Sequence, residues 1–189
     1  MAVEAWIGPV IIAAAIAGLV NVVGWFVASL RDRRADDRRR REKQDDLATA
    51  LLAEITHYRA ALTFFDLDEV WETVAEEMSE NEDYVPFIPT ERNDTIFSAI
   101  LADIHILPED VIQPVTRYYN QVFAIDAIIA DLRSNALRSE SRDIRLAVYT
   151  DYISLKKQAL DDGNSAIAAL SAHLSVSRAR SALTKDGAR

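Results

Sequence analysis

A stretch of twenty-five residues near the start of the chain, residues 6–30 (WIGPVIIAAAIAGLVNVVGWFVASL), contains no ionisable side chain. The charged run RDRRADDRRRREK, residues 31–43, follows it at once. A helix needs about 20 apolar residues to cross roughly 30 Å of hydrocarbon. Residues 1–30 are therefore predicted to form one transmembrane anchor. A secretory signal peptide fits less well, because its apolar region is shorter and is preceded by basic residues, whereas the only charged side chain before this segment is Glu4.

The residues that flank the apolar segment predict its orientation. Trp6 and Trp25 lie nineteen positions apart, roughly 28 Å along a helix, and indole rings are favoured at the two membrane interfaces. Eight basic residues follow the segment, beginning with Arg31, Arg33 and Arg34, and none precedes it. Lys and Arg prefer the cytoplasmic side of a membrane. We therefore expect a single-pass protein of the bacterial inner membrane, with the amino terminus outside and the carboxyl-terminal domain in the cytoplasm.

Residues 31–46 are predicted to continue the membrane helix as a charged stalk. Acidic side chains are interleaved with the eight basic ones, so that the charged run has a net charge of +4. Asp36 and Arg40 are four positions apart, as are Asp37 and Arg41, and such pairs stabilise a solvated helix by ~0.2 to 0.5 kcal/mol each. The alternative is that the basic residues bind anionic lipid head groups.

Small residues and one amide share a stripe of the predicted membrane helix. Ala14, Gly18 and Asn21 recur at spacings of four and three, which places them on one helical face. Small residues permit close approach of two helices, and an Asn in lipid gains ~0.6 to 2 kcal/mol by bonding to a partner. The stripe favours a protein partner or a homo-oligomer formed through this helix. Alternatively, Asn21 bonds a carbonyl of its own helix.

The composition of the remaining chain limits its fold and its partners. Residues 47–189 carry a net charge of −10, which disfavours nucleic-acid binding, since that binding depends on clustered Lys and Arg. The absence of cysteine excludes disulfides and thiolate metal sites. Five Gly, five Pro and few alternating apolar runs leave little room for a sheet. The predicted fold is all-α, with a small helical bundle over residues 47–177 and a flexible tail over residues 178–189.

Apolar spacing and capping residues place the helices of this bundle. Asp66 followed by Glu69 predicts a second helix, with Met78 on its buried face. Residues 81–90 contain two prolines and are expected to cross the bundle in extended form. One apolar stripe is predicted to continue from the stalk, and it comprises Leu47, Leu51, Ile55, Tyr58, Leu62 and Phe65.

The later helices are predicted in the same way. Thr90 is expected to cap a helix that carries Ile96, and Pro108 to open a long helix. Pro114 is expected to kink that long helix or delay its start, because it removes one backbone hydrogen bond. In the last long helix, the Gly163–Asn164 pair is predicted to end or interrupt the helix.

Candidate catalytic and metal-binding groups are sparse. Glu54 and His57 have the Glu-x-x-His spacing of di-metal bundles, but those sites need a second such pair and two more inward glutamates, so an ordinary surface pair is preferred. Asp103 and His105 diverge on a helix, because residues two apart do not face each other. There is no glycine-rich phosphate loop and no H-E-x-x-H, G-x-S-x-G or kinase signature. We predict no catalytic residue, no cofactor and no metal.

An aromatic patch is the remaining candidate for recognition. Tyr119 and Arg117, with Trp71, Tyr84 and Phe87, are residue types favoured at interfaces. Core packing is the preferred alternative for this region, because its neighbour Tyr118 lies on the predicted buried stripe.

The segment YVPFIPTERNDTIFSAILADIHILPEDVIQPVTRYYNQVFAIDAIIADL, residues 84–132, resembles uncharacterised single-pass bacterial membrane proteins that combine an amino-terminal anchor with a helical cytoplasmic domain. The resemblance implies an architecture and a bacterial inner-membrane location, and no activity. Together these patterns favour a membrane-anchored helical interaction or scaffold module, such as an accessory subunit of a membrane complex, without catalytic activity. Two alternatives stay open: an anchored enzyme with a carboxylate or metal site, and a phage-related membrane-permeabilising protein.

Overall fold

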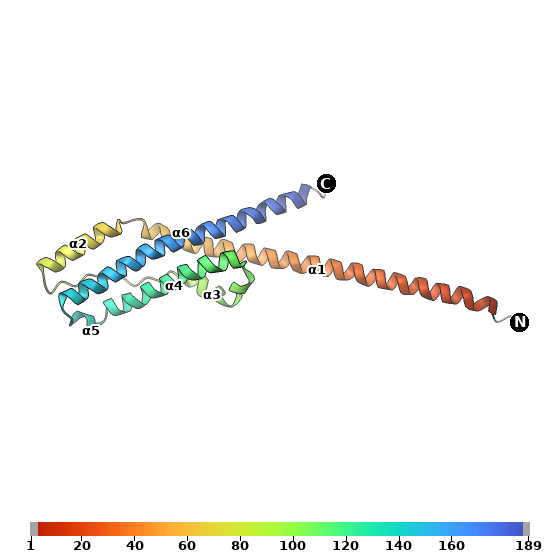
Figure 1. Ribbon diagram of the computed structural model, residues 1–189, viewed down its shortest axis with the longest axis horizontal. Helices are drawn as coiled ribbons and strands as arrows, with labels where there is room; N and C mark the ends of the chain where they lie inside the picture. The colour runs from red at the N-terminus through yellow and green to blue at the C-terminus, as the bar shows by residue number, and fades with distance from the viewer. Residues whose placement is uncertain (1–3, 187–189) are drawn as a thin grey trace. The chain divides into compact units, whose positions relative to one another are not determined.

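The computed structural model describes the backbone of residues 4–186 and the side chains of residues 25, 29, 31–33 and 35–183 (Figure 1). Over the described backbone there are helices and connecting segments but no strand, so the predicted all-α fold is confirmed. The elements are α1 (Glu4–Leu62), α2 (Leu67–Glu80), α3 (Thr95–Ile100), the 3₁₀ helix η1 (Leu101–Ile106), α4 (Glu109–Leu132), α5 (Asn135–Arg138) and α6 (Arg142–Asp186).

The chain divides into two compact units, residues 1–43 and 44–189. In the first unit, α1 runs without a break through the charged run, whose described side chains are exposed. Among the described residues, no helix combines the length and the apolar character that a membrane crossing requires. Apart from Trp25 and Ser29, the side chains of the predicted anchor lie outside the described residues. The anchor therefore stays a prediction.

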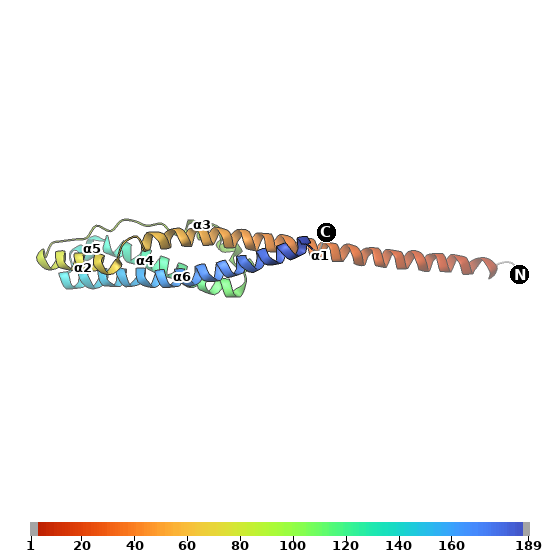
Figure 2. The same cartoon turned by 90° about the horizontal axis from the view of Figure 1, so that it is seen from above.

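The second unit is a bundle built from the last third of α1, from α4 and from α6. Figures 1 and 2 both show α4 and α6 side by side, running in opposite directions because the short helix α5 turns the chain between them. The amino-acid pattern explains the burial of α1, since Leu51 and Ile55 of the predicted stripe are fully buried. Phe65, the last residue predicted for this stripe, is instead 63% exposed, because α1 ends at Leu62.

Helix α2 begins as its sequence predicts. The Asp66 carboxylate accepts hydrogen bonds from the backbone N–H groups of Asp68 and Glu69, which have no partner within the helix. Met78 is buried on the inner face. The indole N–H of Trp71 donates to the Thr150 hydroxyl at 2.9 Å, which joins α2 to α6.

The segment between α2 and α3 is extended, as predicted, and side chains of the bundle hold it in place. Arg133 donates to the Ile88 carbonyl at 2.9 Å, and the buried Arg145 donates to the Glu82 carbonyl. These bonds satisfy carbonyls that have no helical partner. The side chain of Ile88 is buried, whereas that of Phe87 is 88% exposed.

The start of α3 corrects one prediction. Asp94, and not Thr90, precedes the first helical residue, and Asp94 makes no side-chain hydrogen bond to the backbone of α3. A carboxylate from α1, that of Glu54, binds the first N–H groups of α3 instead. The residue buried from this helix is Phe97, whereas Ile96 is only half-buried.

Helix α4 follows its predicted pattern more closely. Pro108 is its N-cap residue, and the predicted inward positions such as Val115 and Val122 are buried. Pro114 lies inside α4 and does not delay the helix, which begins at Glu109.

Helix α6 is longer than the sequence predicts. Gly163 neither ends nor interrupts it, and residues 178–186, predicted as a flexible tail, continue it as helix. A Cβ at Gly163 would lie 3.2 Å from Cε2 of Tyr118. This glycine therefore permits close packing of α6 on the Tyr118 ring, which explains why a glycine stands in the middle of a helix.

Candidate functional site

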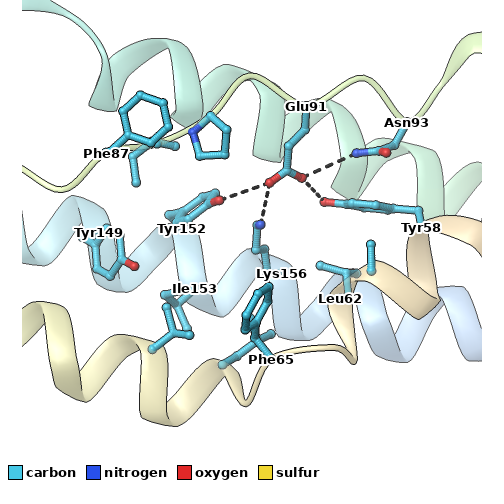
Figure 3. A pocket seen from close by; sticks show the side chains of 15 residues that line it. Tyr58, Leu62, Phe65, Phe87, Glu91, Asn93, Tyr149, Tyr152, Ile153 and Lys156 are labelled. Carbon is cyan, nitrogen blue, oxygen red and sulfur yellow. Dashed lines mark hydrogen bonds and ion pairs between the residues drawn. The ribbon is translucent and has the colours of Figure 1, made fainter.

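A pocket of about 410 Å³ opens in the second unit where the end of α1, the start of α2, the extended segment and α6 converge. Most of its wall is apolar and comes from all four segments. α1 and the turn after it contribute Leu62 and Phe65, the start of α2 contributes Val70, and α6 contributes Ile153. Phe87, from the extended segment, lies at the opposite side of the pocket from Phe65 (Figure 3).

One carboxylate, that of Glu91, organises the polar part of this pocket (Figure 3). Its Oε1 accepts hydrogen bonds from the Lys156 ammonium at 2.6 Å and, weakly, from the Tyr152 hydroxyl at 3.4 Å. Its Oε2 accepts from the Tyr58 hydroxyl at 2.7 Å and from the Asn93 amide at 3.5 Å. Four donors therefore converge on one acceptor group, and they come from α1, α6 and the segment that carries Glu91.

Lys156 and Glu91 form an ion pair that is largely withdrawn from solvent, with side chains only 14% and 17% exposed. The Lys156 ammonium also lies 4.8 Å from the centre of the Tyr152 ring, within the range of a cation–π contact. Tyr152 and Lys156 are four positions apart on α6, which places both side chains on one face of the helix.

The tyrosines around the pocket are held in their neutral form. Burial, reinforced by the charge of Glu91 and the hydrogen bond to it, raises the pKa of both Tyr58 and Tyr152 well above the usual range. Burial raises the pKa of Tyr149 to about 12. Each hydroxyl keeps its proton at neutral pH, so Tyr58 and Tyr152 act as hydrogen-bond donors to Glu91.

A second, half-buried carboxylate has a structural role. Glu54 accepts from the backbone N–H groups of Ile96 at 2.6 Å and Phe97 at 3.1 Å, and from the Tyr119 hydroxyl at 2.6 Å. It thereby caps α3 from another helix. His57, its Glu-x-x-His partner in the sequence, is exposed. The carboxylate is thus committed to the fold, and the described residues contain no group of three or more His, Cys, Asp and Glu placed to bind a metal.

One residue predicted for a partner surface, Tyr119, lies in the core. Tyr119 is fully buried, stacked on Phe97 with ring centres 3.9 Å apart, and hydrogen-bonded to Glu54. It belongs to the core, which corrects its assignment to a surface. Arg117, one position before the pair of tyrosines, is exposed.

The residues predicted for membrane anchoring and helix contact lie mostly outside the described side chains. This holds for Trp6, Ala14, Gly18, Asn21 and Arg34. Trp25 is 72% exposed, and Arg31 and Arg33 are exposed as well.

Sequence reasoning missed the Glu91 cluster. The spacing of Tyr152 and Lys156 was the one local signal, because residues four apart on a helix are neighbours. Nothing local links either residue to Glu91, which lies 65 positions from Lys156.

No family model, no curated protein and no solved structure matches this chain. Over the described residues, the chain is an all-helical protein whose bundle carries a mainly apolar pocket around a partly buried ion pair.

Proposed function

We propose that the protein is a membrane-anchored helical interaction or scaffold module without catalytic activity, which serves as an accessory subunit of a membrane complex. The observation that carries the proposal is the apolar segment 6–30 with its one-sided basic flank. Support also comes from α1, a single helix that includes this segment, the charged stalk and the first part of the bundle core. A continuous helix is a direct way to join an anchor to a folded domain.

The proposed location is the bacterial inner membrane, with the amino terminus outside and residues 44–189 in the cytoplasm. The lipid bilayer is then the first partner, contacted through Trp6, Trp25 and the first arginines of the stalk. The second partner is another protein or a second copy, held through the stripe of Ala14, Gly18 and Asn21. No cofactor and no nucleic acid take part.

Cysteine labelling tests the location and the orientation, because the chain has no cysteine of its own. The variants Ala2→Cys and Ala182→Cys each place a single thiol near one end of the chain. Intact cells that express either variant are treated with a membrane-impermeant maleimide. We expect labelling of Ala2→Cys in intact cells and of Ala182→Cys only after lysis. A protein released from membranes by alkaline carbonate contradicts the anchor. The opposite labelling pattern contradicts the orientation.

Crosslinking in native membranes followed by mass spectrometry tests the interaction role. Asn21→Leu and Gly18→Leu are expected to reduce the crosslinked species, whereas Val23→Leu should not, because position 23 lies on the opposite face of the helix from the stripe. A protein that stays monomeric and partnerless, with no difference among these variants, refutes the scaffold proposal. A fall in membrane potential on expression would favour the membrane-permeabilising alternative instead.

A further inference from the structure

We propose that the pocket around Glu91 and Lys156 binds an uncharged, mainly apolar molecule that presents a carbonyl oxygen to Lys156. The pocket lies within residues 44–189, so this inference is independent of the membrane anchor. Its volume of about 410 Å³ falls in the range of sites that hold small molecules, roughly 300 to 1,000 Å³. Such sites combine apolar walls with a few convergent polar groups, which is the arrangement here.

Hydrogen-bond accounting sets the polarity of the ligand. A carboxylate has about four lone-pair positions. Around Glu91, two donors lie at 2.6 and 2.7 Å, and two weaker ones lie at 3.4 and 3.5 Å. Lys156 has three ammonium protons, and its one hydrogen bond among the described residues goes to Glu91. The ion pair can therefore offer donors to a ligand, whereas each carboxylate oxygen already accepts one short hydrogen bond. A ligand that accepts a hydrogen bond satisfies this arrangement, whereas a ligand that must donate to the carboxylate does not.

The charges of the pocket residues further limit which ligands can bind. Among the described residues that line the pocket, only Glu91 and Lys156 are of types that are charged at neutral pH, and their charges cancel. An anionic ligand would compete with Glu91 for Lys156 and leave an excess negative charge away from water, which is costly. A cationic ligand would face the lysine. An uncharged carbonyl group binds the free ammonium protons without either cost.

The walls of the pocket favour an apolar and at least partly aromatic body. Phe65 and Phe87 are 63% and 88% exposed on opposite sides of the pocket (Figure 3). Aromatic rings pair with other rings in stacked or edge-on contacts. A flat ligand between Phe65 and Phe87 would cover apolar surface that water now contacts.

Benzophenone is a suitable probe, because it is uncharged, aromatic and carries one carbonyl group. On irradiation its oxygen takes a hydrogen atom from a nearby C–H group, and the two carbon radicals combine into one C–C bond, so that the ketone becomes a tertiary alcohol. Purified full-length protein is irradiated with increasing concentrations of benzophenone, and the adducts are located by peptide mass spectrometry. We expect saturable labelling of pocket residues such as Leu62 and Ile153.

The anionic analogue 4-benzoylbenzoate tests the charge argument. It has the same reactive ketone and an added carboxylate, and we expect it to label the pocket about 10-fold less at equal concentration. Equal or stronger labelling by this analogue overturns the assignment of an uncharged ligand.

Two variants and one control test the site. Ala61→Trp adds an indole at an exposed lining position without removing a core side chain, and it should reduce the labelling of Leu62 and Ile153 about 10-fold. Lys156→Met removes the donor and should raise the half-saturating concentration about 10-fold, as expected for a hydrogen bond from a charged group. Lys157→Met changes the next lysine, which pairs with Asp68 and does not line the pocket, and should leave labelling unchanged. Circular dichroism confirms that each variant is folded.

Labelling that fails to saturate, that falls outside the pocket, or that persists in Ala61→Trp refutes the proposal. Equal effects of Lys156→Met and Lys157→Met refute the role of Lys156. Because Ala61→Trp keeps the ion pair intact, a loss of stability in Lys156→Met leaves the test of the pocket valid.

Discussion

Replacing Glu54 by alanine tests whether a carboxylate from α1 holds the start of α3. In the native protein this carboxylate accepts two backbone N–H groups, those of Ile96 and Phe97, and the Tyr119 hydroxyl, all at 3.1 Å or less. Asp94, the N-cap residue of α3, makes no capping bond of its own. No described side chain other than Glu54 therefore bonds these two N–H groups.

The expected loss in the free energy of unfolding follows from these three hydrogen bonds. A hydrogen bond to a charged group contributes about 1.5 to 3 kcal/mol, and a buried donor left without a partner costs about 1 to 3 kcal/mol. Water can reach part of the site, since Glu54 is half-buried, so the three costs do not add in full. We expect Glu54→Ala to lower the free energy of unfolding by about 3 to 4 kcal/mol.

Glu54→Gln removes the negative charge of the side chain and keeps nearly the same shape. A glutamine has one oxygen and one NH₂ group, so one of the two carboxylate positions becomes a donor that faces a backbone N–H. We expect a loss of about 2 kcal/mol, smaller than for alanine, because one acceptor remains. Tyr119→Phe, which removes only the hydroxyl, should cost about 1 to 2 kcal/mol alone and less when combined with Glu54→Ala.

Two measurements check this reasoning on the full chain in mild detergent. Urea unfolding followed by circular dichroism gives the free energies, and hydrogen exchange with mass spectrometry gives the protection of the amides at positions 96 and 97. His57→Ala, at an exposed position one turn further along α1, is the control and should change little. A loss below about 1 kcal/mol for Glu54→Ala, or unchanged protection at residues 96 and 97, would show that Glu54 does not cap α3.

Two further predictions concern the tyrosines and Gly163. Burial raises the pKa of five tyrosines in the folded protein, namely Tyr58, Tyr118, Tyr119, Tyr149 and Tyr152. As the pH rises, the unfolded chain therefore loses these protons before the folded chain does. The free energy of unfolding should be unaffected below about pH 10 and should fall above it by ~1.4 kcal/mol per pH unit for each tyrosine still protonated in the fold. Tyrosinate absorbance and circular dichroism should then change together in an alkaline titration, and ionisation of all tyrosines without unfolding would contradict this. Gly163→Leu should cost about 1 to 3 kcal/mol by overpacking, because even a Cβ there lies 3.2 Å from the Tyr118 ring; Ser165→Leu, at an exposed site on the same helix, is the control, and equal unfolding midpoints for the two variants would contradict close packing at Gly163.

The sequence was sufficient for the helices because their signals are local. Apolar residues at spacings of three and four predicted the buried faces of α1 and α4, and Asp66 predicted the start of α2 through bonds to the N–H groups two and three positions later. Such patterns need no knowledge of a distant partner. Where the local signal was ambiguous, the prediction was wrong: Gly163 resembles a helix end, yet in the structure the glycine makes room for Tyr118.

The pocket could not be predicted, because the bonds that connect Glu91 to α1 and α6 join distant parts of the chain. Glu91 lies 33 positions from Tyr58 and 65 from Lys156, and no spacing rule connects such residues. The same holds for Glu54, whose Glu-x-x-His spacing suggested a metal ligand while its partners lie 42 to 65 positions away. The local sequence around a carboxylate in an amphipathic helix can be the same whether that carboxylate contacts solvent, a metal ion or a distant backbone group.

The extended segment before α3 explains why both carboxylates are where they are. A segment without helical hydrogen bonds must have its backbone groups satisfied by side chains, and here Arg133 and Arg145 supply donors to its carbonyls. Glu54 supplies the acceptor where the chain re-enters a helix, and Glu91 ties the segment to α1 and α6. The segment is also fixed by the side chain of Ile88, which is buried in the core. The ion pair in the pocket between this segment, α1, α2 and α6 is therefore part of the same support that holds the segment on the bundle.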